Sequence, residues 1–183
     1  RKDGENRMKL GRLLMETYGL KDAFIVPSSL SKTQVNTAIA EAASMYISER
    51  LTENSFINMG YGDTPSRILN NLATVAERPI TCVSLTGGVS YYLPDTRSNV
   101  FNAKLHLIPT PLLASSKEMA DAMRHEASVT EVSRMISLAQ LTVVGVGAMH
   151  ESATIFKSGI LNRNDFLYLQ MQGAVGDLLS HFI

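Results

Sequence analysis

Short apolar runs alternate along the chain with longer segments whose apolar residues repeat at helical spacing. The runs predict strands over residues 23–27, 55–60, 80–88, 104–109 and 141–147. The longer segments predict helices over residues 5–18, 31–51 and 162–172, and helices that begin near Thr64, Ser115 and Ser128. Apolar strands separated by amphipathic helices are typical of a parallel sheet that is covered on both faces. We therefore expect one α/β domain, a mostly parallel open sheet with helices on both faces.

Several of these helices have a recognisable start. In a capping box, two side chains three residues apart satisfy free N–H groups of the first turn. The residue pairs that fit this pattern are Ser31 with Gln34, Ser115 with Glu118, and Ser128 with Glu131. Pro65 follows Thr64, and proline suits the first turn of a helix because an N–H there has no helical partner.

Composition and charge narrow the kind of protein. The 183 residues are 45% hydrophobic and 19% charged, which fits one soluble globular domain with a sizeable core. Seventeen basic residues balance seventeen acidic ones. A domain that grips DNA usually carries a basic stripe, but the most basic stretch, residues 1–12, is diluted by Asp3 and Glu5. This part of the protein is not expected to hold DNA by itself.

The N-terminus and the single cysteine indicate in which compartment of the cell the protein is expected. The N-terminus does not resemble a signal peptide, and no apolar run approaches the roughly 20 residues that cross a bilayer. We therefore expect a cytoplasmic protein without a membrane partner. The chain begins at Arg1 rather than at methionine, which suggests a fragment of something longer. Cys82 is the only cysteine, so neither a disulfide nor a cysteine-based zinc site is expected.

Four predicted strands lead into segments of small and polar residues, and three of these segments contain glycine. In an open α/β sheet, ligands bind at the carboxyl ends of the strands. Glycine lets the backbone approach a ligand closely, and the free N–H groups of a helix N-terminus attract an anion. We expect a phosphorylated, hydroxyl-rich small molecule to bind at these segments, which are residues 60–64, 86–89, 113–116 and 145–148.

Motifs for nucleotides and for catalysis are missing. Gly60-Tyr61-Gly62 lacks the third glycine of a dinucleotide site, and the sequence contains neither a P-loop nor a Gly-x-Ser-x-Gly elbow. No pair of histidines or carboxylates has metal-ligand spacing on one helix, so we expect no metal and no cofactor. His150 is the one histidine near the predicted rim, and an exposed loop position is its simpler interpretation.

Asp177 differs from the other acidic residues because it follows glycine in an apolar segment, residues 173–177. An acid in such a place either caps a turn or accepts hydrogen bonds from sugar hydroxyls. The residues alone leave both interpretations open.

Stretches that resemble one known family follow one another in the family's order, at residues 59–64, 84–89, 108–116, 143–147 and 173–177. They resemble the effector-binding domain of the SorC-type sugar-binding transcriptional regulators. The similarity runs from about Leu10 to Ile183, which is nearly the whole chain. The ordered set is fairly specific to this family.

The resemblance implies a fold like that of glucosamine-phosphate and ribose-phosphate isomerases, without their catalytic machinery. It implies a DNA-binding domain before Arg1, a linker helix region over residues 1–20, and an effector-binding domain over residues 21–183. In such regulators a phosphosugar binds at the strand ends and changes subunit assembly, and so operator binding. The leucine face of the linker helix is the expected contact to a second subunit, in a dimer or tetramer.

The resemblance also assigns pocket residues by position. Asp177 would accept hydrogen bonds from ligand hydroxyls, which favours the binding interpretation of this residue. With the adjoining strand-end positions, the predicted ligand-binding set is Gly60, Gly62, Asp63, Thr64, Leu85, Thr86, Gly87, Gly88, Ala114, Ser115, Ser116 and Asp177.

Departures from the family pattern bear on the ligand. Members that bind a sugar bisphosphate have two hydroxyl residues in the first loop and an arginine at the position of Thr86. Here Asp63 is acidic and Thr86 is neutral, which favours a ligand with one phosphate or none. The family also continues past Ile183 with a Gly-Gly-x-x-Lys stretch whose lysine pairs with phosphate, so we expect a domain truncated at its C-terminus.

The sequence therefore predicts a sensor domain that is not an enzyme. It would bind a small phosphorylated sugar-like effector and relay that state to DNA-binding and oligomer contacts. A sugar-phosphate isomerase on the same fold is the main alternative, with Asp63 or Asp177 and His150 as its only acid–base candidates. A pure oligomerisation module is a third interpretation, but it gives the four small, polar strand ends no purpose.

Overall fold

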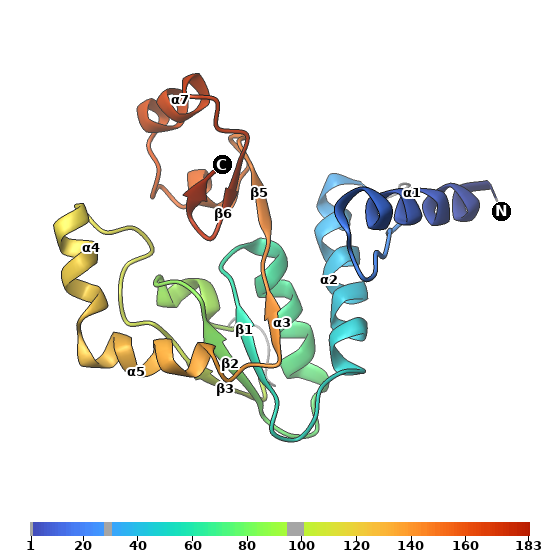
Figure 1. Cartoon of the computed structure of the whole chain (residues 1–183), viewed down its shortest axis with the longest axis horizontal. Helices are drawn as coiled ribbons and strands as arrows, with labels where there is room; N and C mark the ends of the chain where they lie inside the picture. Colours follow the sequence, from blue (N-terminus) through green and yellow to red (C-terminus); the bar gives the residue numbers. More distant parts are fainter. Residues whose placement is uncertain (1, 28–30, 95–100) are drawn as a thin grey trace.

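The centre of the computed structural model is a parallel sheet of four strands (Figure 1). The structure describes residues 2–27, 31–94 and 101–183. In spatial order the strands are β3 (Ala103–His106), β2 (Ile80–Ser84), β1 (Phe56–Met59) and β4 (Leu141–Val143). The two central strands, β1 and β2, are almost completely buried, which explains their unbroken apolar pattern. The predicted parallel sheet is confirmed.

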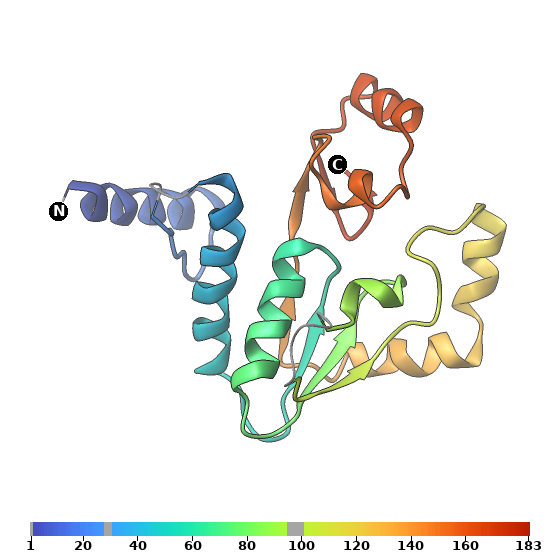
Figure 2. The ribbon, with the colours of Figure 1, turned by 180° about the vertical axis from the view of Figure 1, so that it is seen from behind.

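Helices flank this sheet on both sides (Figures 1 and 2). α3 (Asp63–Val75) packs on one face, and α2 (Lys32–Ser48) packs against α3. On the other side, α5 (Ala127–Ile136) contacts β2 and follows α4 (Lys117–Arg124). The centre of the core is formed by side chains that are almost fully buried: Ile57, Met59, Ile68, Leu69, Leu72 and Val83.

α1 (Lys2–Tyr18) extends away from this body (Figure 1). It confirms the predicted first helix and leaves Met8, Leu13 and Tyr18 largely exposed. The strand predicted over residues 23–27 is wrong, because these residues have no regular secondary structure. Instead they lie against α1, where Arg7 Nη1 donates a hydrogen bond to the Ile25 carbonyl at 3.3 Å. Among the described residues, no helix is both long and apolar enough to span a membrane.

The strand predicted over residues 141–147 is divided between two sheets. The chain leaves the parallel sheet after β4 and continues as β5 (Val146–Ala148). β5 pairs antiparallel with β6 (Gly176–Leu178), which pairs antiparallel with β7 (His181–Phe182). Gly145 lies at the break, where a Cβ atom would come within 3.1 Å of Pro65 Cδ. The apolar run did not reveal this change of sheet, because it does not show with which strands its two halves pair.

Short elements complete the fold. η1 (Val89–Tyr92) is a 3-10 turn after β2, so the strand predicted over residues 80–88 stops at Ser84. α6 (Thr154–Lys157) and α7 (Arg163–Met171) lie between β5 and β6, and α7 confirms the helix predicted over residues 162–172.

The helix predicted to begin near Thr64 begins at Asp63, and of the three predicted capping boxes only the first is present. Gln34 Oε1 accepts a hydrogen bond from the Ser31 backbone N–H at 3.2 Å, as the capping box requires. α4 is capped by Ser116 rather than Ser115, because it is Ser116 Oγ that accepts from the Met119 N–H, at 3.1 Å. The N-cap of α5 is Glu126, so the expected cap residue, Ser128, lies inside the helix.

Candidate functional site

The order of the parallel strands defines one point at which a ligand site is expected. From β1 the chain moves through β2 to β3 in one direction, and it then returns to place β4 on the other side of β1. The strand order therefore reverses between β1 and β4, and ligands bind at such a switch point. A cavity of about 1040 Å³ opens there. Its volume is at the upper end of the roughly 300–1000 Å³ that is typical of small-molecule sites.

The cavity is lined mainly by the segments that follow β1 and β4, and by the chain that leads into and through α6. Its lining residues include Asn36, Tyr61–Arg67, Ser90, Tyr91, Leu93, Gly145–Ala148, Ser152–Thr154, Lys157, Ser158 and Asp177. Both sheets contribute, because Asp177 lies on β6 directly opposite Gly147 of β5. A side chain at Gly147 would crowd the carboxylate, since its Cβ would lie 3.2 Å from Asp177 Oδ2.

Asp177 is the most buried charged group of the cavity, with 6% of its surface exposed. The hydroxyl of Tyr61 donates a hydrogen bond to Asp177 Oδ2, while Oδ1 has no hydrogen-bond partner in the described part of the chain. Burial and the neighbouring Asp177 carboxylate raise the pKa of Tyr61, so its hydroxyl stays protonated and remains a donor. The ring of Tyr61 packs edge-on against Tyr91, with centroids 5.6 Å apart.

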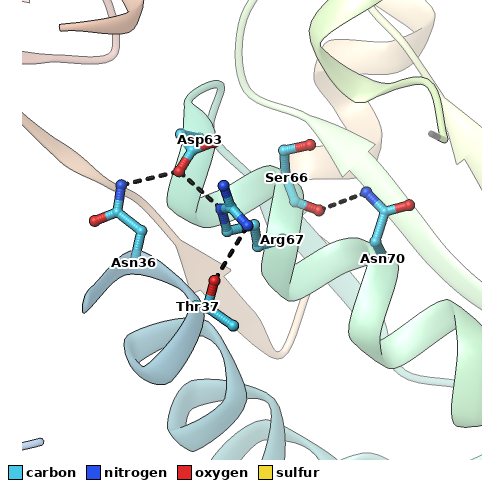
Figure 3. Close-up of polar contacts among 6 residues, drawn as sticks. All are labelled: Asn36, Thr37, Asp63, Ser66, Arg67 and Asn70. Atoms are coloured by element: carbon cyan, nitrogen blue, oxygen red, sulfur yellow. Dashed lines mark hydrogen bonds and ion pairs between the residues drawn. The ribbon is translucent and has the colours of Figure 1, made fainter. Parts of the chain in front are cut away.

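A polar cluster forms a second part of the cavity wall (Figure 3). Asp63 Oδ2 accepts hydrogen bonds from Asn36 Nδ2 and from Arg67 Nε, both at 2.9 Å. Arg67 Nη1 also donates to Thr37 Oγ1 at 3.2 Å. Partial burial raises the pKa of Asp63. Hydrogen bonds from Arg67 and Asn36, with the charges of Arg67 and Lys157, more than offset this, so the pKa lies below its ordinary value.

The charged side chains in the lining balance in number. Arg67 and Lys157 are cationic, and Asp63 and Asp177 are acidic. His150 is not in the lining, and its Nδ1 is hydrogen-bonded to Ser152 Oγ at 2.8 Å. Within the described ranges, no group of three or more His, Cys, Asp or Glu side chains could hold a metal ion.

Predicted ligand-binding residues fall into two groups. Those in the cavity lining are Gly62, Asp63, Thr64 and Asp177. Those outside it are Gly60, Leu85, Thr86, Gly87, Gly88, Ala114, Ser115 and Ser116. Apart from Gly60, which follows β1, the second group follows β2 and β3, and its role in binding stays a prediction.

Several residues of the second group have contacts within the protein that account for their identity. A Cβ at Gly87 would lie 2.2 Å from Thr110 Oγ1 and 2.3 Å from the Pro111 carbonyl oxygen. A Cβ at Gly60 would lie 2.8 Å from Leu179 Cδ2. The hydroxyl of Thr86 is hydrogen-bonded to that of Tyr92 at 2.7 Å. These glycines allow close approach of protein to protein, where the sequence suggested approach to a ligand.

The lining also contains residues that the sequence did not single out. Tyr61 lies between Gly60 and Gly62, which were both predicted to bind ligand, and this position could have indicated that Tyr61 lines the cavity too. Arg67 lies four residues after Asp63 on a helix, a spacing at which opposite charges pair. Asn36 and Lys157 have no comparable signal in the sequence, because the packing of α2 and α6 alone brings them to the cavity.

The family model described as "Putative sugar-binding domain" matches residues 2–183 of this chain. The chain belongs to this sugar-binding domain family. The resemblance to SorC-type regulators that was predicted from the motifs is therefore confirmed.

Curated relatives of this sugar-binding domain are transcriptional regulators by name. It is 30% identical over 182 residues to the transcriptional regulator LsrR of Klebsiella pneumoniae subsp. pneumoniae, covering 98% of this chain and 56% of the relative. It is 26% identical over 185 residues to the deoxyribonucleoside regulator of Bacillus subtilis, covering 94% of this chain and 58% of the relative. The sugar-binding domain thus spans little more than half the length of these relatives.

A solved structure shows the same fold. The full-length sorbitol operon regulator SorC from Klebsiella pneumoniae aligns with a TM-score of 0.75 at 19% identity. The alignment covers 99% of the sugar-binding domain and 62% of the SorC chain. The predicted α/β fold class is confirmed.

Proposed function

We propose that this sugar-binding domain is the effector-binding part of a transcriptional regulator. Its effector would be a small phosphorylated sugar or sugar-like molecule, bound in the cavity between the ends of β1 and β4. The observation that carries the proposal is the buried Asp177 carboxylate, which lines the cavity and has one oxygen without a partner among the described residues. A buried acceptor without a donor is costly, and a sugar hydroxyl supplies such a donor.

The charges of the cavity support a ligand with a single phosphate. Lys157 and Arg67 provide cationic groups for an anion, and the guanidinium of Arg67 suits a phosphate because it can donate two parallel hydrogen bonds. Asp63 and Asp177 in the same lining would repel a second phosphate. A monophosphate with free hydroxyls is therefore favoured over a bisphosphate.

The names of the relatives support a role in transcription. Effector binding would change contacts to an operator that are made outside this chain, and it would change assembly into a dimer or tetramer in the cytoplasm. The balanced charge of the chain, with 17 basic and 17 acidic residues, agrees with DNA contacts located elsewhere. The site residues predicted near β2 and β3 would then serve the fold or a neighbouring part of the pocket.

A sugar-phosphate isomerase on the same fold would need an acid and a base that reach the substrate together. The candidate pair was His150 with Asp63 or Asp177, but His150 lies outside the lining and is hydrogen-bonded to Ser152. The cavity of the described chain thus lacks the imidazole that this alternative requires. We therefore favour a sensor over an enzyme.

A thermal-shift screen of this domain tests the proposal directly. Ribose 5-phosphate, erythrose 4-phosphate and glucose 6-phosphate are each compared with the unphosphorylated sugar and with inorganic phosphate. A ligand at 100 times its Kd adds about 2.7 kcal/mol to the free energy of unfolding, which raises Tm by several degrees. We expect the phosphorylated compounds to give the larger shifts. If none of the compounds shifts Tm, the proposal fails.

Matched variants locate the binding site. Lys157→Ala removes a cation of the lining, and Lys117→Ala removes an exposed lysine of α4 outside it. We expect the shift with a phosphorylated compound to fall in Lys157→Ala and in Asp177→Asn and to persist in Lys117→Ala. Equal shifts in all of these variants would move the site away from this cavity.

A further inference from the structure

Two helices meet at the cavity wall through the polar cluster of Figure 3. Asn36 and Thr37 belong to the first two turns of α2, while Asp63 and Arg67 belong to the start of α3. Hydrogen bonds from Asn36 to Asp63, and from Arg67 to Thr37, join the two helices there. Asn36, Asp63 and Arg67 face the cavity, whereas Thr37 is not among its lining residues.

The rest of the contact between these helices is mainly apolar, with one hydrogen bond from Ser44 Oγ to the Ile68 carbonyl at 3.5 Å. Further along α2 and α3 the buried residues include Ala40, Ile68 and Leu72, each at most 4% exposed. Apolar packing of this sort does not depend on charges in the cavity, whereas the polar end of the contact does. The two helices are thus joined by a permanent apolar contact and, at the cavity, by hydrogen bonds that can change partner.

We propose that Arg67 couples the charge in the cavity to the position of the N-terminal end of α2. An anion in the cavity competes with Asp63 for the guanidinium, since both are negatively charged oxygen acceptors. When the Arg67 guanidinium moves toward the anion, its Nη1 is withdrawn from Thr37. Repulsion between the anion and Asp63 weakens the bond to Asn36 as well, so both contacts to α2 are lost in one event.

The end of α2 that is released lies next in sequence to the segment that connects it to α1. α1 stands away from the domain body and exposes apolar residues, among them Met8, Leu13 and Tyr18 (Figure 1). A change at the start of α2 therefore reaches the part of the chain best placed to contact another subunit or domain. This coupling rests on the proposed function, because it needs an anionic effector in the cavity.

Anion binding and the loss of the Arg67–Thr37 hydrogen bond are linked, so the coupling predicts the direction in which anion affinity changes when that bond is removed. If anion binding must break the Arg67–Thr37 hydrogen bond, removing that bond in advance makes binding easier. Thr37→Val removes the hydroxyl and keeps the shape of the side chain. We expect this variant to bind inorganic phosphate and ribose 5-phosphate roughly two- to tenfold more tightly, the range of one hydrogen bond, and to bind ribose unchanged.

The experiment combines titration calorimetry with hydrogen exchange of the 183-residue chain. With ribose 5-phosphate, amides in the first turns of α2 should exchange faster in the parent chain, while those of α5 stay constant. In Thr37→Val the same α2 amides should exchange fast with or without ribose 5-phosphate. Thr130→Val, which removes a threonine hydroxyl from α5, is the matched control and should behave like the parent.

The outcomes separate the coupling from the binding itself. Two results would overturn the coupling and leave the proposed function intact. One is unchanged or weaker phosphate affinity in Thr37→Val, and the other is hydrogen exchange in α2 that does not change when ribose 5-phosphate binds to the parent chain. Failure of the parent chain to bind any of the phosphorylated sugars of the screen, or inorganic phosphate, overturns both.

Discussion

The carboxyl ends of β1 and β4 and those of β2 and β3 look alike in the sequence but differ in the fold. All four lead into segments of small and polar residues, three of which contain glycine. The cavity is nevertheless lined mainly by the segments that follow β1 and β4, and the chain after β2 contributes Ser90, Tyr91 and Leu93 but none of its glycines. The difference lies in connectivity, since the strand order of the parallel sheet reverses between β1 and β4. Around β2 and β3, the similar residues pack against other parts of the protein. Glycine near a strand end therefore indicates that another group lies close to the backbone, but this group can be a ligand or another segment of the protein.

The largest effect should come from adding a methyl group at the end of β2. In Gly87→Ala the new Cβ would lie 2.2 Å from Thr110 Oγ1 and 2.3 Å from the Pro111 carbonyl, so backbone must move. We expect a loss of about 3 kcal/mol or more in the free energy of unfolding, measured by urea denaturation. Gly145→Ala at the end of β4, with its nearest contact at 3.1 Å, should cost clearly less. Equal losses of unfolding free energy in Gly87→Ala and Gly145→Ala would contradict the proposed difference between the two strand ends.

Tyrosine hydroxyls at the two sites provide a smaller contrast. Tyr61→Phe leaves the buried Asp177 carboxylate without its tyrosine donor, which should cost roughly 1–3 kcal/mol of unfolding free energy. Tyr92→Phe removes the partner of Thr86, whose hydroxyl keeps a bond to the Gly87 carbonyl. Thermal unfolding should therefore show the larger loss of stability in Tyr61→Phe, and the reverse order would contradict the assignment of Asp177 as the costly buried group.

Paired threonine variants compare the two sites for binding. Thr64 lines the cavity, and Thr86 is hydrogen-bonded to Tyr92 outside it. Thr64→Ala should weaken ribose 5-phosphate binding by roughly two- to tenfold, the range of one hydrogen bond, in a calorimetric titration. Thr86→Ala should lower Tm slightly and leave the affinity unchanged. If Thr86→Ala weakens binding more, the pocket extends to β2 as the sequence predicted.

The smallest effect concerns acid stability. Because the pKa of Asp63 is lowered in the folded chain, its ionised form adds stability above its unfolded pKa of about 3.9, and this is lost as pH falls through the folded pKa. The side chain is 45% exposed, so the gain should stay below about 1 kcal/mol. Asp63→Asn should be less stable than the parent at pH 6, and the difference should shrink below pH 4. A difference independent of pH would exclude the ionised carboxylate as its cause.

The sequence predicted the fold class well because burial of β1 and β2 leaves a clear apolar pattern. Asp177, Asp63 and Thr64 could also be anticipated, since they follow strands or resemble a family motif. The division of residues 141–147 between two sheets could not be anticipated, because an apolar run does not reveal its pairing partners. Lys157 and Asn36 were missed for a related reason. Their place in the cavity results from how separate helices pack, and no local pattern encodes that.

The change of sheet after β4 has a consequence for the order in which the protein is made. The strands of the parallel sheet end at Val143, but the wall that bears Asp177 depends on pairing between β5 and β6. The Tyr61–Asp177 bond joins positions 116 residues apart. The ribosome releases the N-terminal part first, so the four strands of the parallel sheet emerge before β6 and Asp177. The parallel sheet and the cavity wall that bears Asp177 therefore become complete at different stages of synthesis.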